Sequence, residues 1–119
     1  MTSYRIVGSA RLQLAAIVAK SLEDYGERRA RNYRSLLLLA MNDVAVMPRR
    51  PGAVQVRKLS GVFVYDIGLS RHRQSVGERV RNPWRKLIYR CDEDGVTEIL
   101  AIVGRSYPSG RAAREALPQ

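Results

Sequence analysis

The residues best suited to chemistry in this chain are its arginines and lysines, and most of them lie in one stretch. Residues 49–90 carry 11 Arg and Lys against two acids, a net charge of +9, whereas residues 1–48 carry +3 and residues 91–119 carry −2. A guanidinium binds a phosphate or a carboxylate through two parallel hydrogen bonds. Like charges at this density repel one another unless an acidic partner compensates them. The sequence therefore predicts an anionic partner, either a nucleic acid or a protein rich in Asp and Glu.

The best candidates for contact with such a partner lie in and just after a polar, basic segment at residues 70–83, called here the excursion. For any single residue, a solvated surface position without a partner is the alternative. Trp84 is either a core anchor, which is the preferred interpretation, or an exposed residue at an interface. The contact candidates are Arg71, Arg73, Arg79, Arg81, Trp84, Arg85 and Lys86.

Other reactive residue types are sparse. His72 is the only His, lies between two arginines, and is expected to be a surface residue without a role. Cys91 is the only Cys, and we expect a small buried or half-buried residue rather than a nucleophile, because no base motif accompanies it. A single Cys forms no intrachain disulfide, which fits a reducing cytoplasm. With one His, one Cys and scattered acids, we expect neither a metal site nor a cofactor.

The first half of the chain predicts a short strand followed by two helices. The strand covers residues 4–7, and Ser9 is expected to be the N-cap of a helix that begins near residue 10 and stops at Gly26. In the next helix, five residues spaced alternately four and three positions apart lie on one face, and Pro48 ends the helix. Because the link is so short, the two helices must fold back as a hairpin. The five residues are Tyr33, Leu37, Ala40, Val44 and Met47.

The second half predicts strands separated by turns, within one domain that spans residues 1–119. Residues 49–56 are expected to form a loop, and strands are expected at 62–69, 86–91 and 96–103, the last being the most apolar and therefore central. A short helix should cover 111–117. The order β-α-α-β-β-β predicts an α+β fold in which the helical hairpin packs on one face of a small, mostly antiparallel sheet.

The helix face leaves two interpretations open. Leu38 and Leu39 lie off the main apolar stripe, so that face is either a wide core face or one side of a groove for a partner helix. The longest apolar run, residues 36–41, is far shorter than the roughly 20 residues that a membrane span needs, and we expect no membrane partner.

This order and several local strings resemble the RelE/ParE family of toxins from bacterial type II toxin–antitoxin systems, and the ParE branch more closely. The strings are Tyr-Arg-Ile-Val at 4–7, Leu-Ile-Tyr-Arg at 87–90, and the acidic turn with the strand that follows at 92–105. The resemblance covers nearly the whole chain. It implies a growth-inhibiting toxin that a cognate acidic antitoxin neutralises, with homo- or hetero-oligomers formed through that antitoxin. ParE toxins are known as inhibitors of DNA gyrase, whereas RelE toxins cleave messenger RNA in the ribosome.

A RelE-like activity would need a catalytic set. Attack of a 2′-hydroxyl on the adjacent phosphate requires a proton acceptor, a proton donor and cations that hold the developing charge. The resemblance implies Arg90, Arg105 and Tyr107 for these roles, but Ser106 stands where RelE has a second basic residue, and Pro108 replaces a residue that is often charged.

We therefore expect a cytoplasmic, non-catalytic, ParE-like toxin that acts by binding a target such as DNA gyrase. A RelE-like, ribosome-dependent endoribonuclease is the alternative. A basic nucleic-acid-binding module is the second alternative, although the tyrosines mostly fit strand or helix faces, which argues against single-strand binding.

Overall fold

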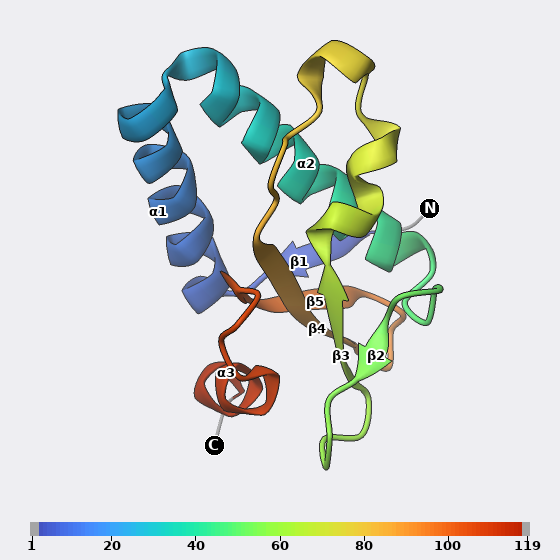
Figure 1. Cartoon of the computed structure of the whole chain (residues 1–119). Coiled ribbons are helices and arrows are strands. Elements are labelled where there is room, and N and C mark those ends of the chain that lie inside the picture. The colour runs from blue at the N-terminus through green and yellow to red at the C-terminus, as the bar shows by residue number, and fades with distance from the viewer. Residues whose placement is uncertain (1–2, 118–119) are drawn as a thin grey trace.

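The structure is a computed structural model that describes residues 3–117. Its five strands form one sheet in the order β1-β5-β4-β3-β2, in which every neighbouring pair is antiparallel except β1 and β5. Two 3-10 segments, η1 (Ile67–Arg73) and η2 (Val76–Glu78), lie between β3 and β4. The expected α+β fold with a helical hairpin is confirmed (Figure 1). The elements are β1 (Tyr4–Ile6), α1 (Gly8–Tyr25), α2 (Glu27–Val46), β2 (Val54–Gln55), β3 (Val62–Asp66), β4 (Arg85–Cys91), β5 (Thr97–Gly104) and α3 (Ser109–Ala116).

Both faces of the sheet are covered. On one face, α2 buries an apolar stripe against the rings of Phe63, Tyr65 and Tyr89, which contribute to the larger core. On the other face, α3 packs two alanines, Ala112 and Ala113, into a second, smaller core. Figure 1 shows α3 below the sheet. Because alanine side chains are short, a helix of eight residues can approach the sheet closely and cover it.

A bulge in the β4–β5 pair sorts the side chains between these two cores. Ile88 pairs with Ala101 but Tyr89 pairs with Ile99, so Leu100 is an extra residue without a partner on β4. The extra residue sends Leu100 and Ala101 to the α3 core and leaves Ile99 in the hairpin core. The middle strand is β4, not β5 as the apolar run at 96–103 suggested, although β5 is also paired on both sides.

Side chains of α1 complete the sheet where β1 stops. The strand β1 pairs with β5 only as far as Ile99. Beyond that point, the Ser9 hydroxyl donates to the Leu100 carbonyl at 3.1 Å, and the Ile102 amide donates to the Gln13 side-chain oxygen at 2.7 Å. The prediction that Ser9 caps α1 is therefore wrong: the N-cap is Val7, with no side-chain cap, and Ser9 protects the exposed edge of β5 instead.

The region on either side of β3 also departs from expectation. The predicted loop at 49–56 contains a two-residue edge strand, β2, that pairs with β3. The predicted strand at 62–69 ends at Asp66, whose carboxylate accepts a hydrogen bond from the Gly68 amide at 2.8 Å and turns the chain into η1. Leu69 is consequently exposed. Within residues 3–117, none of the helices combines the length and the apolar character that spanning a membrane requires.

Because the Tyr89 hydroxyl is buried, we expect the protein to lose stability at alkaline pH. This hydroxyl donates to the Pro48 carbonyl at 2.5 Å, and burial raises the pKa of Tyr89, helped by Tyr65 and opposed by Arg50. The folded protein therefore holds the Tyr89 proton more tightly than the unfolded chain does. The protonated hydroxyl makes its full contribution to the free energy of unfolding below the ordinary pKa of 10.0, and this contribution is lost as pH rises past that value. Tyr89→Phe should cost about 1 kcal/mol at neutral pH and make the alkaline decline shallower, as measured by urea unfolding across pH.

Tyr25→Phe is the matched control for this prediction, because the Tyr25 side chain is exposed. It should leave both the neutral-pH stability and the alkaline slope as they are in the parent protein. An equally steep alkaline decline in Tyr89→Phe would contradict the assignment.

Candidate interaction surface

The excursion is fixed to α2 by a buried carboxylate. Asp43 is 2% exposed and accepts a hydrogen bond from the Ser70 hydroxyl at 2.6 Å. Arg73 forms an ion pair with the same carboxylate, and the Tyr65 and Ser70 hydroxyls lie 2.9 Å apart. Arg50, in the segment that follows α2, donates a hydrogen bond to the backbone carbonyl of Asp43 at 2.9 Å. A buried carboxylate is stable only when it is paired and hydrogen-bonded, so these contacts hold η1 against the end of α2.

Gln74 supplies a second anchor. It is buried, its amide nitrogen donates to the Asn32 carbonyl of α2 at 2.8 Å, and its oxygen accepts from the Val80 amide at 3.2 Å. Arg79 then donates to the carbonyls of Gln74 and His72 at 3.2 and 3.3 Å. The excursion is therefore a folded structure with fixed side-chain positions, not a loose loop.

Four of the predicted contact residues have internal roles. Arg73 and Arg79 bond within the fold as described. Arg85 is half-buried beside Tyr33, where burial raises the pKa of the phenol and the Arg85 charge opposes that rise. Lys86 is also half-buried; burial lowers the pKa of its amine, and Asp66 acts in the opposite direction. The chain thus uses part of its central positive charge to hold itself together.

The remaining contact candidates meet around a pocket of about 440 Å³ at the end of the excursion. Trp84 is 52% exposed, so the preferred interpretation of a core anchor was wrong. Its ring lies over Gly104, where an added Cβ would come within 2.8 Å of the ring. Arg105 lines the same pocket and is held by Asp66 at 2.8 Å and the Pro83 carbonyl at 3.1 Å. We call this the Trp84 surface, and it comprises Arg71, Arg81, Trp84 and Arg105.

One donor on this surface is unsatisfied. The Nε atom of Arg71 is buried and has no hydrogen-bond partner among the residues that the structure describes. A buried donor without an acceptor costs about 1–3 kcal/mol. The Arg71 side chain is therefore held in place at some energetic cost.

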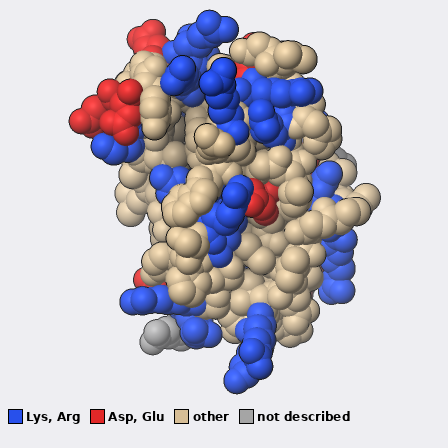
Figure 2. Space-filling model, in the orientation of Figure 1, with Lys and Arg blue, Asp and Glu red and all other residues tan. Residues whose placement is uncertain are grey.

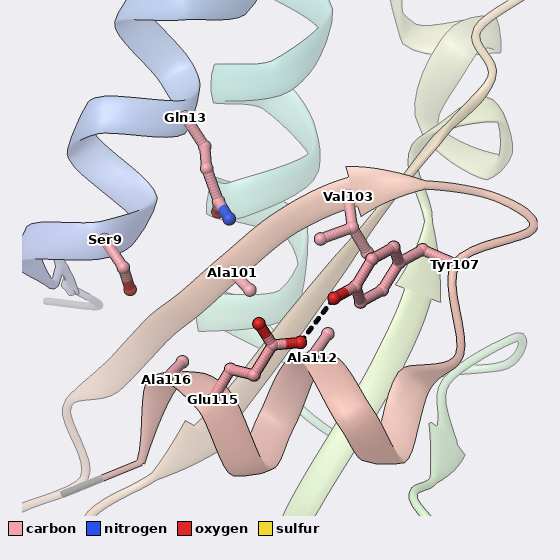
Figure 3. A pocket seen from close by; sticks show the side chains of 8 residues that line it. All are labelled: Ser9, Gln13, Ala101, Val103, Tyr107, Ala112, Glu115 and Ala116. Atoms are coloured by element: carbon pink, nitrogen blue, oxygen red, sulfur yellow. Dashed lines mark hydrogen bonds between the residues drawn. The ribbon is translucent and has the colours of Figure 1, made fainter.

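The three residues implied for RelE-like catalysis are not brought together as one set. Arg90 pairs with Glu98 at 2.8 Å near the far end of β4, whereas Arg105 pairs with Asp66 beside Trp84. Tyr107 lines a separate pocket of about 300 Å³ between α1, β5 and α3 (Figure 3). Its hydroxyl donates to Glu115, and this hydrogen bond raises the pKa of Tyr107. A raised pKa makes the phenol a poorer proton donor.

The two remaining reactive residues are both exposed. His72 lies on the surface, as expected, whereas Cys91 is exposed and not buried or half-buried as predicted, because it is the last residue of β4 at the acidic turn. Within residues 3–117, no group of three or more His, Cys, Asp or Glu side chains is placed to hold a metal ion.

Comparison with known proteins gives a likeness of fold. No protein-family model matches the chain, and a search of curated proteins finds no match. Among solved structures, the chain is similar to one described as "Chromosomal ParDE TA system from P. aeruginosa", with a TM-score of 0.63 and 15% identity over 87% of this chain and 96% of that chain. The fold that the sequence strings implied is therefore shared with a chain of that ParDE structure.

The two anchors of the excursion were missed at the sequence level. Asp43 lies in the apolar second half of α2, one residue before a position of the predicted stripe, and a carboxylate so placed is a sign of a buried ion pair. Gln74 carries no comparable signal, because a glutamine in a polar loop is ordinary.

Because Asp43 anchors the excursion, we expect that its replacement by the neutral isostere Asn loosens the excursion. Asp43→Asn keeps the shape but removes the charge that Arg73 and Ser70 bind, and should lower the free energy of unfolding by about 2 kcal/mol. Hydrogen exchange should rise in η1 and η2 before it rises in β4. Asp24→Asn is the control, since Asp24 forms only an exposed pair with Lys20, and it should cost about 0.5 kcal/mol or less. Equal costs for the two variants would contradict the anchor.

Proposed function

We propose that this chain is the ParE-like toxin of a type II toxin–antitoxin module, and that it inhibits growth by binding a cellular target such as DNA gyrase. The observation that carries the proposal is the fold likeness, over 87% of the chain, to a chain of a ParDE toxin–antitoxin structure. In this proposal the protein acts in the cytoplasm and an acidic cognate antitoxin neutralises it. The net charge of +10 favours such a partner.

The Trp84 surface is the proposed contact with the target. Tryptophan and arginine are the residue types most enriched where truncation costs the most binding energy at interfaces. Here a half-exposed Trp84 lies among three arginines, and it rests on Gly104 in a fixed position. The unsatisfied Arg71 also supports this proposal, since a carboxylate on the partner could draw that side chain outward and accept its donors.

Action by binding is favoured over RNA cleavage by the placement of the candidate catalytic residues. Arg90 and Arg105 are each paired with a carboxylate in a different part of the sheet, and the Tyr107 hydroxyl donates to Glu115. A ribonuclease needs its cations free to stabilise one phosphate and its proton donor beside them.

Two assays on the purified protein separate these mechanisms. The proposal predicts inhibition of DNA supercoiling by gyrase and no cleavage of ribosome-bound messenger RNA. Cleavage without an effect on supercoiling would overturn it in favour of the RelE-like alternative. A short acidic protein encoded beside this gene should restore growth when the two are co-expressed.

Truncation of Trp84 should weaken target inhibition. Trp84→Ala should raise the concentration needed for half-inhibition by about 30-fold, which corresponds to an interface residue worth about 2 kcal/mol. The variant should keep its fold, because the indole is half exposed, and a thermal melt checks this. Arg57→Ala removes an exposed cation that does not line the pocket and should change inhibition less than twofold, within about 0.4 kcal/mol.

A further inference from the structure

A second basic site lies where the α1–α2 connection meets the excursion. This groove has a volume of about 450 Å³, and none of the described residues that line it is Asp or Glu. In the orientation of Figure 1, Lys and Arg side chains gather on the upper part of the molecule, with Asp and Glu side chains beside them at the upper left (Figure 2). The groove residues used below are Tyr25, Arg28, Arg29, Arg79, Val80 and Arg81.

Four arginines come from the two sides of this groove. Arg28 and Arg29 are exposed in the first turn of α2, and Arg79 and Arg81 are exposed on the excursion. The hydrogen bonds of Arg79 to the His72 and Gln74 carbonyls set the position of the excursion side. Arg28, Arg29 and Arg81 remain for a ligand. Three guanidinium groups in a groove that no described carboxylate lines form a site for an anion with several charges, and their planar geometry suits phosphate.

An aromatic ring stands among these charges. Tyr25 is 62% exposed at the end of α1, and the Arg29 guanidinium lies 5.8 Å from the centre of its ring. A ring exposed to this extent can stack on a nucleobase, and such stacking tolerates any base because every base has a π face. The expectation that the tyrosines fit helix or strand faces therefore fails at this position.

The lining favours nucleic acid over an acidic protein segment. A partner helix that docks in a groove needs several apolar anchors at helical spacing. This groove offers one aliphatic side chain, Val80, beside arginines, tyrosines and small polar residues. Stacking on Tyr25 also requires an unpaired base, which a duplex does not present.

We propose that this groove binds single-stranded nucleic acid, with Arg28, Arg29 and Arg81 contacting phosphates and Tyr25 stacking on a base. The site is distinct from the toxin function proposed above and does not rest on it, although Arg81 lies between the groove and the Trp84 surface.

The test measures binding of the full chain to a short fluorescent oligothymidylate by anisotropy, with a duplex of the same length as the comparison. The single strand should bind more tightly. The double variant Arg28→Gln/Arg29→Gln should weaken binding by about tenfold and lower the slope of log K against log salt by about 1.4, which is the value for two lost phosphate contacts. The matched control Arg57→Gln/Arg114→Gln removes the same charge from exposed sites outside the groove and should change affinity by less than about twofold.

The stacking contact has its own signature. Tyr25→Ala should reduce affinity by about tenfold without changing the salt slope, and Tyr25→Phe should keep most of the affinity.

An equal loss in the Arg57/Arg114 control would overturn the site, since the charge would then act only as a diffuse field. Equal binding of the duplex, or full competition by polyglutamate at matched charge, would overturn the choice of ligand. None of these measurements involves gyrase or growth, so this proposal and the toxin function can fail separately.

Discussion

The buried carboxylate of Asp43 is the constraint on which both basic sites depend. It lies near the end of α2, and its contacts with Ser70 and Arg73 fix the start of the excursion, while Arg50 holds the segment that leaves the helix. Removing a carboxylate from water is expensive, and only a full set of partners makes it tolerable. The same contacts therefore satisfy the buried charge and stop a long polar segment from moving freely. Together with the Gln74 anchor, these contacts set the positions of Arg79 and Arg81 opposite α2.

The sheet provides the rigid base for this arrangement. Cores on both of its faces hold β4 in place, and β5 supplies apolar side chains to both cores. The bulge at Leu100 sends two consecutive residues, Leu100 and Ala101, to the α3 side. One end of the β4–β5 pair carries Trp84 and Arg105, and the other carries the paired charges of Arg90 and Glu98. At the end beside the excursion, one acid, Asp66, lies among Arg71, Arg81 and Arg105, so the positive charge there is only partly neutralised.

The helices and most strands could be predicted because their signals are local. Spacing by three and four residues marks one face of α2, and alternation assigns Phe63 and Tyr65 to one side of β3. Errors arose where a side-chain hydrogen bond, from a distant or a neighbouring residue, decided the outcome. Ser9 has the chemistry of a cap, but the unpaired edge of β5 lies nearby and takes its hydrogen bond. The strand after Val62 was expected to run on to Leu69, but the Asp66 side chain bonds to the Gly68 amide and ends it.

The sequence by itself determined the order of the helices and the longer strands, the α+β class and the presence of excess positive charge between residues 49 and 90, because each depends on composition or on local periodicity. The tertiary structure alone decided which cations are available to a partner. Arg73, Arg79 and Arg85 carry the same charge as Arg28, Arg29 and Arg81, yet a carboxylate engages Arg73, backbone carbonyls engage Arg79, and Arg85 is half-buried. That outcome depends on Asp43, Gln74 and Tyr33, which lie elsewhere in the chain. The basic block of the sequence is therefore divided between internal contacts and two smaller sites, one around Trp84 and one between α2 and the excursion. These sites also include Arg105, Arg28 and Arg29 from outside the block.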